Sequence, residues 1–265
     1  MSRLQKTFET LAAKKKKAYI GYAMAGFPDQ GHDLAMARGI LAESDVLELG
    51  VPFSDPIADG PVLQHAGERA IAHGGGLKRA LELAKALREG SDKPLLLMSY
   101  LNPLLAMGLE NFAQTAVEAG VDGVVVPDLP PNEQDGFAKV LRKAGLDIAF
   151  LVAPTSTPAR LKAVAKAASG FIYVVSVAGV TGERQGFDAR LEKTVAELRK
   201  HSQLPLAIGF GIASPEGAQA MGKLADGIVV ASTVLKAVQD GLDPDSGVHA
   251  GLERTKLLAH ALKEL

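Results

Sequence analysis

One acidic residue stands inside an otherwise apolar run. Glu48 belongs to residues 46–49, whose other members are valine and leucine. An ionised carboxylate in a buried strand costs several kcal/mol to remove from water unless it is paired or used. Burial also raises its pKa toward neutrality, where a carboxyl group can both donate and accept a proton. Glu48 is therefore a candidate general acid and base, with a salt bridge to a neighbouring strand as the alternative explanation.

Two more carboxylates, Asp55 and Asp59, follow in the segment of residues 52–61, which is rich in proline. Acidic residues beside proline and glycine commonly form turns, and this is the simpler explanation of each one taken alone. Both nevertheless come directly after the run that carries Glu48. The segment therefore predicts a group of carboxylates that faces one ligand.

Segments of small residues, two of them rich in glycine, follow the last three of the eight apolar runs described below. They are residues 179–182, residues 209–212 and residues 231–233, the last of which opens a predicted helix. Backbone N–H groups of such loops, together with a helix N-terminus, bind phosphate without a charged side chain. Any one of these glycines is also explained by a tight turn. Three such segments in succession predict an anion site.

Several other chemistries are disfavoured by the residues that are present. The chain has no cysteine, which excludes disulfides, thiolate metal sites and a catalytic cysteine. No lysine lies in any predicted strand, so Schiff-base chemistry is not expected. The six histidines lack the paired spacing of a metal site. We therefore predict a site that needs neither a metal nor a cofactor.

These residues are positioned by short apolar runs that alternate with amphipathic helical stretches, the pattern of a parallel sheet covered by helices. We count eight such runs and predict a single-domain (β/α)8 TIM barrel over residues 1–265, with an extra N-terminal helix within residues 1–17. A doubly wound open sheet is the alternative. The predicted strands are residues 19–23, 46–49, 95–98, 123–126, 148–152, 171–175, 206–209 and 227–230.

The predicted helices and loops complete this pattern. Residues 51–70 and 178–188 are expected to be irregular, and both follow strand ends at the face where barrel enzymes build their active sites. The predicted helices are residues 33–42, 77–89, 109–118, 133–143, 159–168, 190–200, 215–224 and 248–263.

The composition narrows the class of protein. Hydrophobic residues make up 47% of the 265 residues, enough for a large core, but no apolar stretch is long enough to span a bilayer. The 29 basic and 30 acidic residues nearly balance, which argues against a nucleic-acid or membrane-surface partner. The N-terminal residues lack the unbroken apolar core of a signal peptide, so we expect a cytoplasmic location.

A long motif resembles a known family. The run LELGVPFSDP at residues 47–56, continued by ADGP at residues 58–61, is similar to the signature of tryptophan synthase α subunits. The resemblance covers essentially the whole chain. Its further matches are LMSY at residues 97–100, Asn102-Pro103, GVVVPDL at residues 123–129, Tyr173 with Ser176, AGVTG at residues 178–182, and residues 209–212.

The resemblance implies an activity and roles for individual residues. Members of this family cleave indole-3-glycerol phosphate to indole and glyceraldehyde 3-phosphate in a retro-aldol reaction. For this chain the resemblance implies Glu48 as the general acid and base and Asp59 at the indole N–H. It further implies a β subunit as partner, in an α2β2 heterotetramer in which only the β subunit holds pyridoxal phosphate. The substrate-binding residues that it implies are Tyr173, Thr181, Gly182, Gly211, Ile212, Ala231 and Ser232.

Two positions depart from the family pattern, and other functions stay open. Val177 stands where enteric members have an arginine, which Arg184 could replace, and Ala231 stands where they have a glycine. A sugar-phosphate isomerase or epimerase would share the glycine-rich segments but not Glu48 with Asp59. A free-standing indole-3-glycerol-phosphate lyase and a mainly non-catalytic activating subunit are the remaining alternatives.

Overall fold

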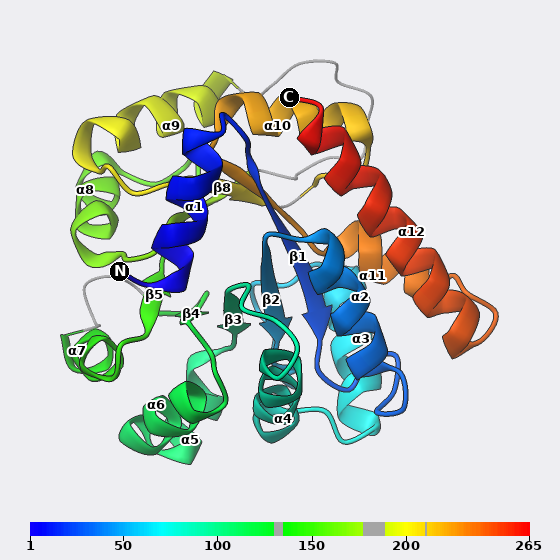
Figure 1. The fold of residues 1–265 in the computed structure, drawn as a ribbon. Helices are drawn as coiled ribbons and strands as arrows, with labels where there is room; N and C mark the ends of the chain where they lie inside the picture. Colours follow the sequence, from blue (N-terminus) through cyan, green and yellow to red (C-terminus); the bar gives the residue numbers. More distant parts are fainter. Residues whose placement is uncertain (130–134, 177–188, 210) are drawn as a thin grey trace.

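Parallel strands form a nearly closed barrel in the computed structural model, which describes residues 1–129, 135–176, 189–209 and 211–265 (Figure 1). Around the barrel their order is β5-β4-β3-β2-β1-β9-β8-β7-β6, and every paired neighbour is parallel. The strands are β1 (Ala18–Met24), β2 (Val46–Gly50), β3 (Leu95–Met98), β4 (Gly123–Val125), β5 (Asp147–Ala149), β6 (Leu151–Val152), β7 (Ile172–Val175), β8 (Leu206–Gly209) and β9 (Gly227–Val230).

The predicted barrel is confirmed, but its fifth strand is divided. β5 pairs only with β4 and β6 pairs only with β7, so the described sheet has nine strands where eight were predicted. The division falls at Phe150, whose carbonyl accepts the Tyr173 N–H at 3.0 Å. The chain changes neighbours there, and the two pieces share no ladder. This change of pairing partner cannot be predicted from the apolar run, because the residues on both sides of Phe150 are buried alike.

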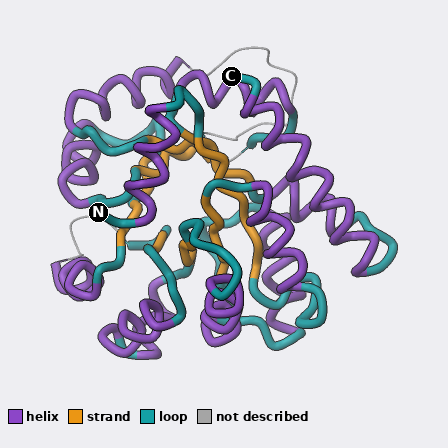
Figure 2. Tube along the Cα trace, in the orientation of Figure 1, coloured by secondary structure: helices purple, strands orange, loops and turns teal. Residues whose placement is uncertain are grey.

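Helices surround the strands, as Figure 2 shows in purple around orange. The predicted N-terminal helix is confirmed as α1: Leu4 and Phe8 are buried, and the Phe8 ring lies 5.9 Å from that of Phe171. The helices are α1 (Arg3–Ala13), α2 (Asp33–Glu43), α3 (Pro61–Ala72), α4 (Leu77–Arg88), α5 (Leu101–Met107), α6 (Leu109–Glu118), α7 (Asp135–Ala144), α8 (Pro158–Ala167), α9 (Ala189–His201), α10 (Pro215–Leu224), α11 (Ser232–Gln239) and α12 (Pro244–Lys263).

The expected irregular segment of residues 51–70 is partly wrong. Its second half is α3, which begins with Pro61 after Gly60 as the N-terminal cap. Proline suits the first helical turn because its missing N–H has no partner there and its φ is already helical. The proline and glycine content that suggested a loop therefore marks the start of a helix. The other expected irregular segment, residues 178–188, lies outside the described residues.

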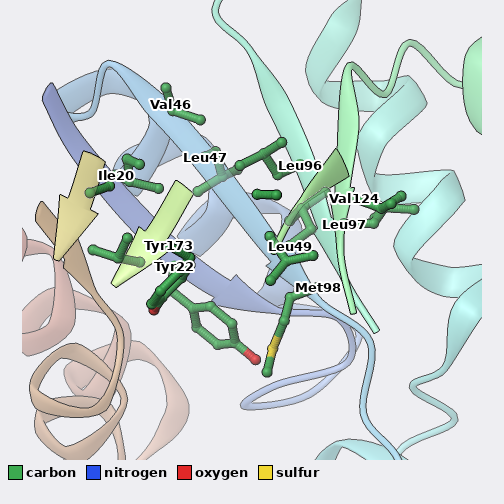
Figure 3. Packing of buried hydrophobic residues seen from close by; sticks show 14 of the residues in the cluster. Ile20, Tyr22, Val46, Leu47, Leu49, Leu96, Leu97, Met98, Val124 and Tyr173 are labelled. Atoms are coloured by element: carbon green, nitrogen blue, oxygen red, sulfur yellow. The ribbon is translucent and has the colours of Figure 1, made fainter. Parts of the chain in front are cut away.

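The strands are buried on both faces, as parallel strands covered by helices must be. All seven residues of β1 are buried, and side chains of β2, β3 and β4 pack together in the core (Figure 3). Among the residues that the structure describes, no helix is both long and apolar enough to cross a membrane.

Candidate active site

Glu48 is the buried carboxyl group at the centre of the site. It lies on β2 opposite Tyr22 of β1, and only 2% of the residue is exposed. Its Oε2 atom is buried and has no hydrogen-bond partner among the described residues. Burial, and secondly the negative charge of Asp59, raise the pKa of Glu48 to about 8. Glu48 is therefore protonated at neutral pH, and the salt bridge considered as an alternative is not formed within the described part of the chain.

Asp59 supplies the second carboxyl group, from the loop between β2 and α3. Its Oδ1 atom is shielded from solvent and has no partner in the part of the chain that the structure describes. Burial raises the pKa of Asp59 to about 6, against a hydrogen bond from Tyr100 that lowers it. Asp59 is therefore mainly ionised at neutral pH. Asp55 lies apart from this pair, because its carboxylate is exposed and accepts the Ser54 hydroxyl at 2.5 Å.

Two buried tyrosines line the same space. Tyr173, on β7, has its pKa raised well above the usual value by burial and by the negative charges of Glu48 and Asp59. Burial and the negative charges of Asp59 and Glu48 likewise raise the pKa of Tyr22, on β1, well above its usual value. Figure 3 shows Tyr22 beside Tyr173. The sequence indicated Tyr173 but not Tyr22. The signal for Tyr22 would have been the register of β1 against β2, which places it opposite Glu48.

Glycines make room for these tyrosine rings. A Cβ atom at Gly50 would overlap the hydroxyl of Tyr22, and one at Gly209 would overlap the hydroxyl of Tyr173. Both glycines end their strands, β2 and β8, so the rings lie across the C-terminal ends of the neighbouring strands. The site is thus built at the end of the barrel where the sequence predicted it.

Tyr100, between β3 and α5, joins the loops of the site. Its hydroxyl accepts the Ala58 N–H at 2.9 Å, and its ring stacks on Phe53 with 5.3 Å between centroids. The next residue, Leu101, donates its N–H to Asp128 at 3.0 Å. Tyr100 is 2% exposed. The sequence matched this tyrosine to the family without giving it a role.

The predicted phosphate segments lie at the same end of the barrel. Gly211 follows β8 with a φ of 73°, a left-handed value that favours glycine, and Ile212 beside it is buried. Ala231 caps α11 at the end of β9, and Ser232 is the first residue of that helix. The φ of Ala231 is −123°, so this position does not adopt the left-handed conformation that favours glycine. The remaining residues of this prediction, Thr181 and Gly182, lie outside the described residues, as do Val177 and Arg184.

A separate cavity of about 890 Å³ lies at the opposite end of the barrel, against α1. Its lining includes Phe8 and Lys15 near α1, and Asp147 and Asp226 at the starts of β5 and β9. None of the predicted site residues that the structure describes lines it. In a barrel of this type the N-terminal end serves stability, whereas chemistry belongs to the C-terminal end.

Comparison with known proteins agrees with this geometry. The family profile described as tryptophan synthase alpha chain matches residues 8–264. The tryptophan synthase alpha chain of Cupriavidus taiwanensis is 46% identical over 245 residues, 91% of each chain. That of Phenylobacterium zucineum is 43% identical over 265 residues, 99% of this chain and 96% of the relative.

Solved structures show the same fold. The tryptophan synthase subunit alpha of Legionella pneumophila superposes with a TM-score of 0.91 at 35% identity, covering 100% of both chains. A chain of Mycobacterium tuberculosis tryptophan synthase gives a TM-score of 0.90 at 33% identity, over 99% of this chain and 98% of that one. With a family profile matched over nearly its whole length, the chain belongs to the tryptophan synthase alpha chain family.

Proposed function

We propose that Glu48 and Asp59 are the catalytic carboxyl groups of this chain. The family cleaves indole-3-glycerol phosphate to indole and glyceraldehyde 3-phosphate, a lyase reaction. One observation carries the proposal: two neighbouring carboxyl groups, Glu48 buried and Asp59 partly buried, each have a shielded oxygen without a partner among the described residues, and burial raises the pKa of Glu48 to about 8 and that of Asp59 to about 6. A general acid beside a fixed negative charge is what this cleavage needs.

The first step is protonation of the indole ring. Protonated Glu48 donates its proton to C3 of the indole, which places a positive charge on the ring. The ionised Asp59 accepts the ring N–H through its open oxygen and stabilises that charge. The charge develops in a buried site, where a fixed carboxylate has far more effect than it would in water.

The second step returns the proton to the enzyme. Glu48, now ionised, takes the proton of the 3′-hydroxyl group. The carbonyl of glyceraldehyde 3-phosphate forms as the bond between C3 and C3′ breaks, and the bonding electrons restore the indole ring. Glu48 thus gives one proton and receives one, and its raised pKa suits both transfers.

The phosphate group anchors the substrate. We assign it to backbone N–H groups around Gly211, Ile212, Ala231 and Ser232, and expect Thr181 and Gly182 to join them. The first N–H groups of α11 have no partner within the helix, and no side chain caps them. A helix N-terminus of this kind attracts anions. Tyr173 lines the space between this anchor and the carboxyl pair.

We also propose the setting in which the chain works. It acts with a β subunit, in an α2β2 heterotetramer in the cytoplasm, and the pyridoxal phosphate belongs to the β subunit alone. The chain itself needs no cofactor for the steps above. We further propose that residues 1–265 form one domain, which is supported by the pairing of β1, near the start, with both β2 and β9.

Glu48→Gln and Asp59→Asn test the carboxyl pair through indole release by the isolated chain. Each keeps the shape of the side chain, and we expect each to reduce turnover by roughly 10²–10⁴-fold, the usual value of a general acid or base. Asp55→Asn is the matched control, because this exposed carboxylate in the same loop should not matter to the isolated chain. Either catalytic variant with more than about a tenth of the activity would remove that residue from the mechanism.

A titration with the cognate β subunit tests the partner. Ile57, in the loop that carries Asp59, is 83% exposed, an apolar side chain suited to a protein contact. We expect complex formation and faster indole release together, and Ile57→Asp should weaken both while sparing the isolated chain. If the two chains never associate, a free-standing lyase becomes the better interpretation. Association without any indole release by this chain would instead indicate a non-catalytic activating subunit.

A further inference from the structure

The hydroxyl of Tyr100 contacts the loop that carries Asp59 at two points. Its oxygen accepts the Ala58 N–H at 2.9 Å, and the hydroxyl also interacts with the carboxylate of Asp59, whose pKa it lowers. A tyrosine hydroxyl has one proton, so it accepts from the amide and donates to the carboxylate. Tyr100 therefore holds both the backbone before Asp59 and the Asp59 side chain.

The bond to Tyr100 leaves the other side of the Asp59 carboxylate open. Oδ1 of Asp59 is buried and has no partner among the described residues. A buried acceptor without a donor is costly, and a ligand N–H would relieve that cost. The hydroxyl thus limits how the carboxylate can turn, and the oxygen that it does not bind stays available.

Tyr100 is itself held both at its ring and at its backbone. Its ring stacks on Phe53, which lies in the same loop as Asp59. It caps α5, whose first residue, Leu101, donates its N–H to Asp128 in the loop after β4. A side chain fixed by packing and hydrogen bonds can in turn fix the group that it touches.

We propose that Tyr100 is a positioning residue for the cleavage: its hydroxyl fixes the backbone N–H of Ala58, next to Asp59, and one side of the Asp59 carboxylate, so that Oδ1 accepts the indole N–H. The inference rests on the proposed role of Asp59 and adds the residue that orients it. Tyr100 acts through Asp59 and takes no proton from the substrate.

The hydroxyl of Tyr100 also influences the pKa of Asp59 in a known direction. Tyr22, Glu48 and Tyr173 interact electrostatically with Asp59, while Tyr100 donates a hydrogen bond to it. Asp128 is the further charge that acts on Tyr100. Of these groups, Tyr100 is the one that lowers the pKa of Asp59 against burial. Loss of its hydroxyl must therefore raise that pKa.

Tyr100→Phe is the test, because it keeps the ring and its stacking on Phe53. We expect kcat/KM at pH 7 to fall by about 10- to 100-fold, the range for one hydrogen bond to a charged group. The acid limb of the pH profile should move to higher pH by about one unit. In the substrate-free variant, the carboxyl carbon of Asp59, observed by NMR, should titrate at higher pH by the same amount.

Two controls separate positioning from general damage. Phe53→Leu removes the stacking but keeps the hydroxyl, so the acid limb should stay in place. In the Asp59→Asn background, Tyr100→Phe should shift no acid limb. If Tyr100→Phe does not fold, difluorotyrosine at residue 100, a stronger donor, should move the limb to lower pH instead.

The results for these variants also separate the role of Asp59 from that of Tyr100. An active Asp59→Asn variant overturns the proposed function itself. An inactive Asp59→Asn variant, together with an unshifted profile and an unshifted carboxyl titration in Tyr100→Phe, overturns only the role of Tyr100.

Discussion

The hydroxyl of Tyr22 lies in the space that any side chain at Gly50 would need. The two residues lie on neighbouring strands: Tyr22 of β1 pairs with Glu48 of β2, and Gly50 lies two positions beyond Glu48. The absence of a side chain at the end of β2 thus decides where a tyrosine of β1 lies. The packing beside Glu48 therefore depends on this glycine.

Gly50→Ala should therefore displace Tyr22. We expect the free energy of unfolding to fall by about 1–3 kcal/mol, the usual cost of overpacking a core, and turnover to fall with it. Gly67→Ala in α3 is the control, because a Cβ there meets nothing within 4 Å. That variant should be neutral or gain up to roughly 1 kcal/mol from the lower flexibility of alanine. Urea denaturation and indole release measure both, and an unaffected Gly50→Ala would contradict the role of this contact.

The activity should have a bell-shaped dependence on pH. Below a pH of about 6 Asp59 becomes protonated and loses its charge, and above about 8 Glu48 becomes ionised and cannot donate a proton. kcat/KM of the isolated chain, which reports the free enzyme, should be highest between these values. Whatever activity Asp59→Asn retains should lack the acid limb. A flat profile from pH 5 to pH 9, about one unit beyond each limb, would exclude this pair of protonation states.

The stability of the protein should depend on pH because of the raised pKa of Glu48. The folded state raises the pKa of Glu48 from 4.5 to about 8, so between these values the folded chain holds a proton that the unfolded chain has released. The free energy of unfolding therefore falls as pH rises through this window, by several kcal/mol in total. It is unaffected by this group below pH 4.5.

Glu48→Gln removes this dependence because glutamine does not titrate. The variant should gain stability relative to the unaltered chain steadily from pH 5 to pH 8, and a series of urea denaturations over about these three units measures the gain. Asp55→Asn, at an exposed carboxylate, serves as the control and should show no such trend. Parallel curves for Glu48→Gln and the unaltered chain would mean that Glu48 is not buried as described.

Gly211→Val should weaken substrate binding. Its φ of 73° is unfavourable for a β-branched residue, and the added side chain would block the approach of a phosphate to the backbone. We expect a raised KM and weaker inhibition by inorganic phosphate, with less effect on kcat. Gly90→Ala, where a Cβ meets nothing within 4 Å, should change neither constant. An unaltered phosphate affinity in Gly211→Val would place the anion elsewhere.

The residues that the sequence singled out for the site are those whose chemistry differs from that of their neighbours. Glu48 is conspicuous because a carboxylate in an apolar run has a high desolvation cost, and the alternation of runs and helices predicted the barrel without any motif. The role of Tyr100 was missed for the opposite reason. A tyrosine near a strand end is ordinary, and its contact with Asp59 depends on how two separate loops meet.

The errors in the fold have similar causes. The start of α3 carries Pro61 and Gly60, residues that mark a loop as readily as a helix start. The division of the fifth strand depends on which neighbour each backbone group meets, and this information is not contained in the apolar run around Phe150. Local composition predicts that a segment is buried, whereas pairing is decided by the rest of the chain.

The division of the strand at Phe150 also bears on the tendency of the protein to aggregate. An open strand edge is a template to which another chain can add a strand, and such edges promote aggregation. The edges at the ends of this sheet belong to β5, three residues long, and β6, two residues long. They are joined by Phe150, which is 2% exposed, so the seam is both short and covered. Within the residues that the structure describes, the barrel is thereby protected against strand addition where its ladder is interrupted.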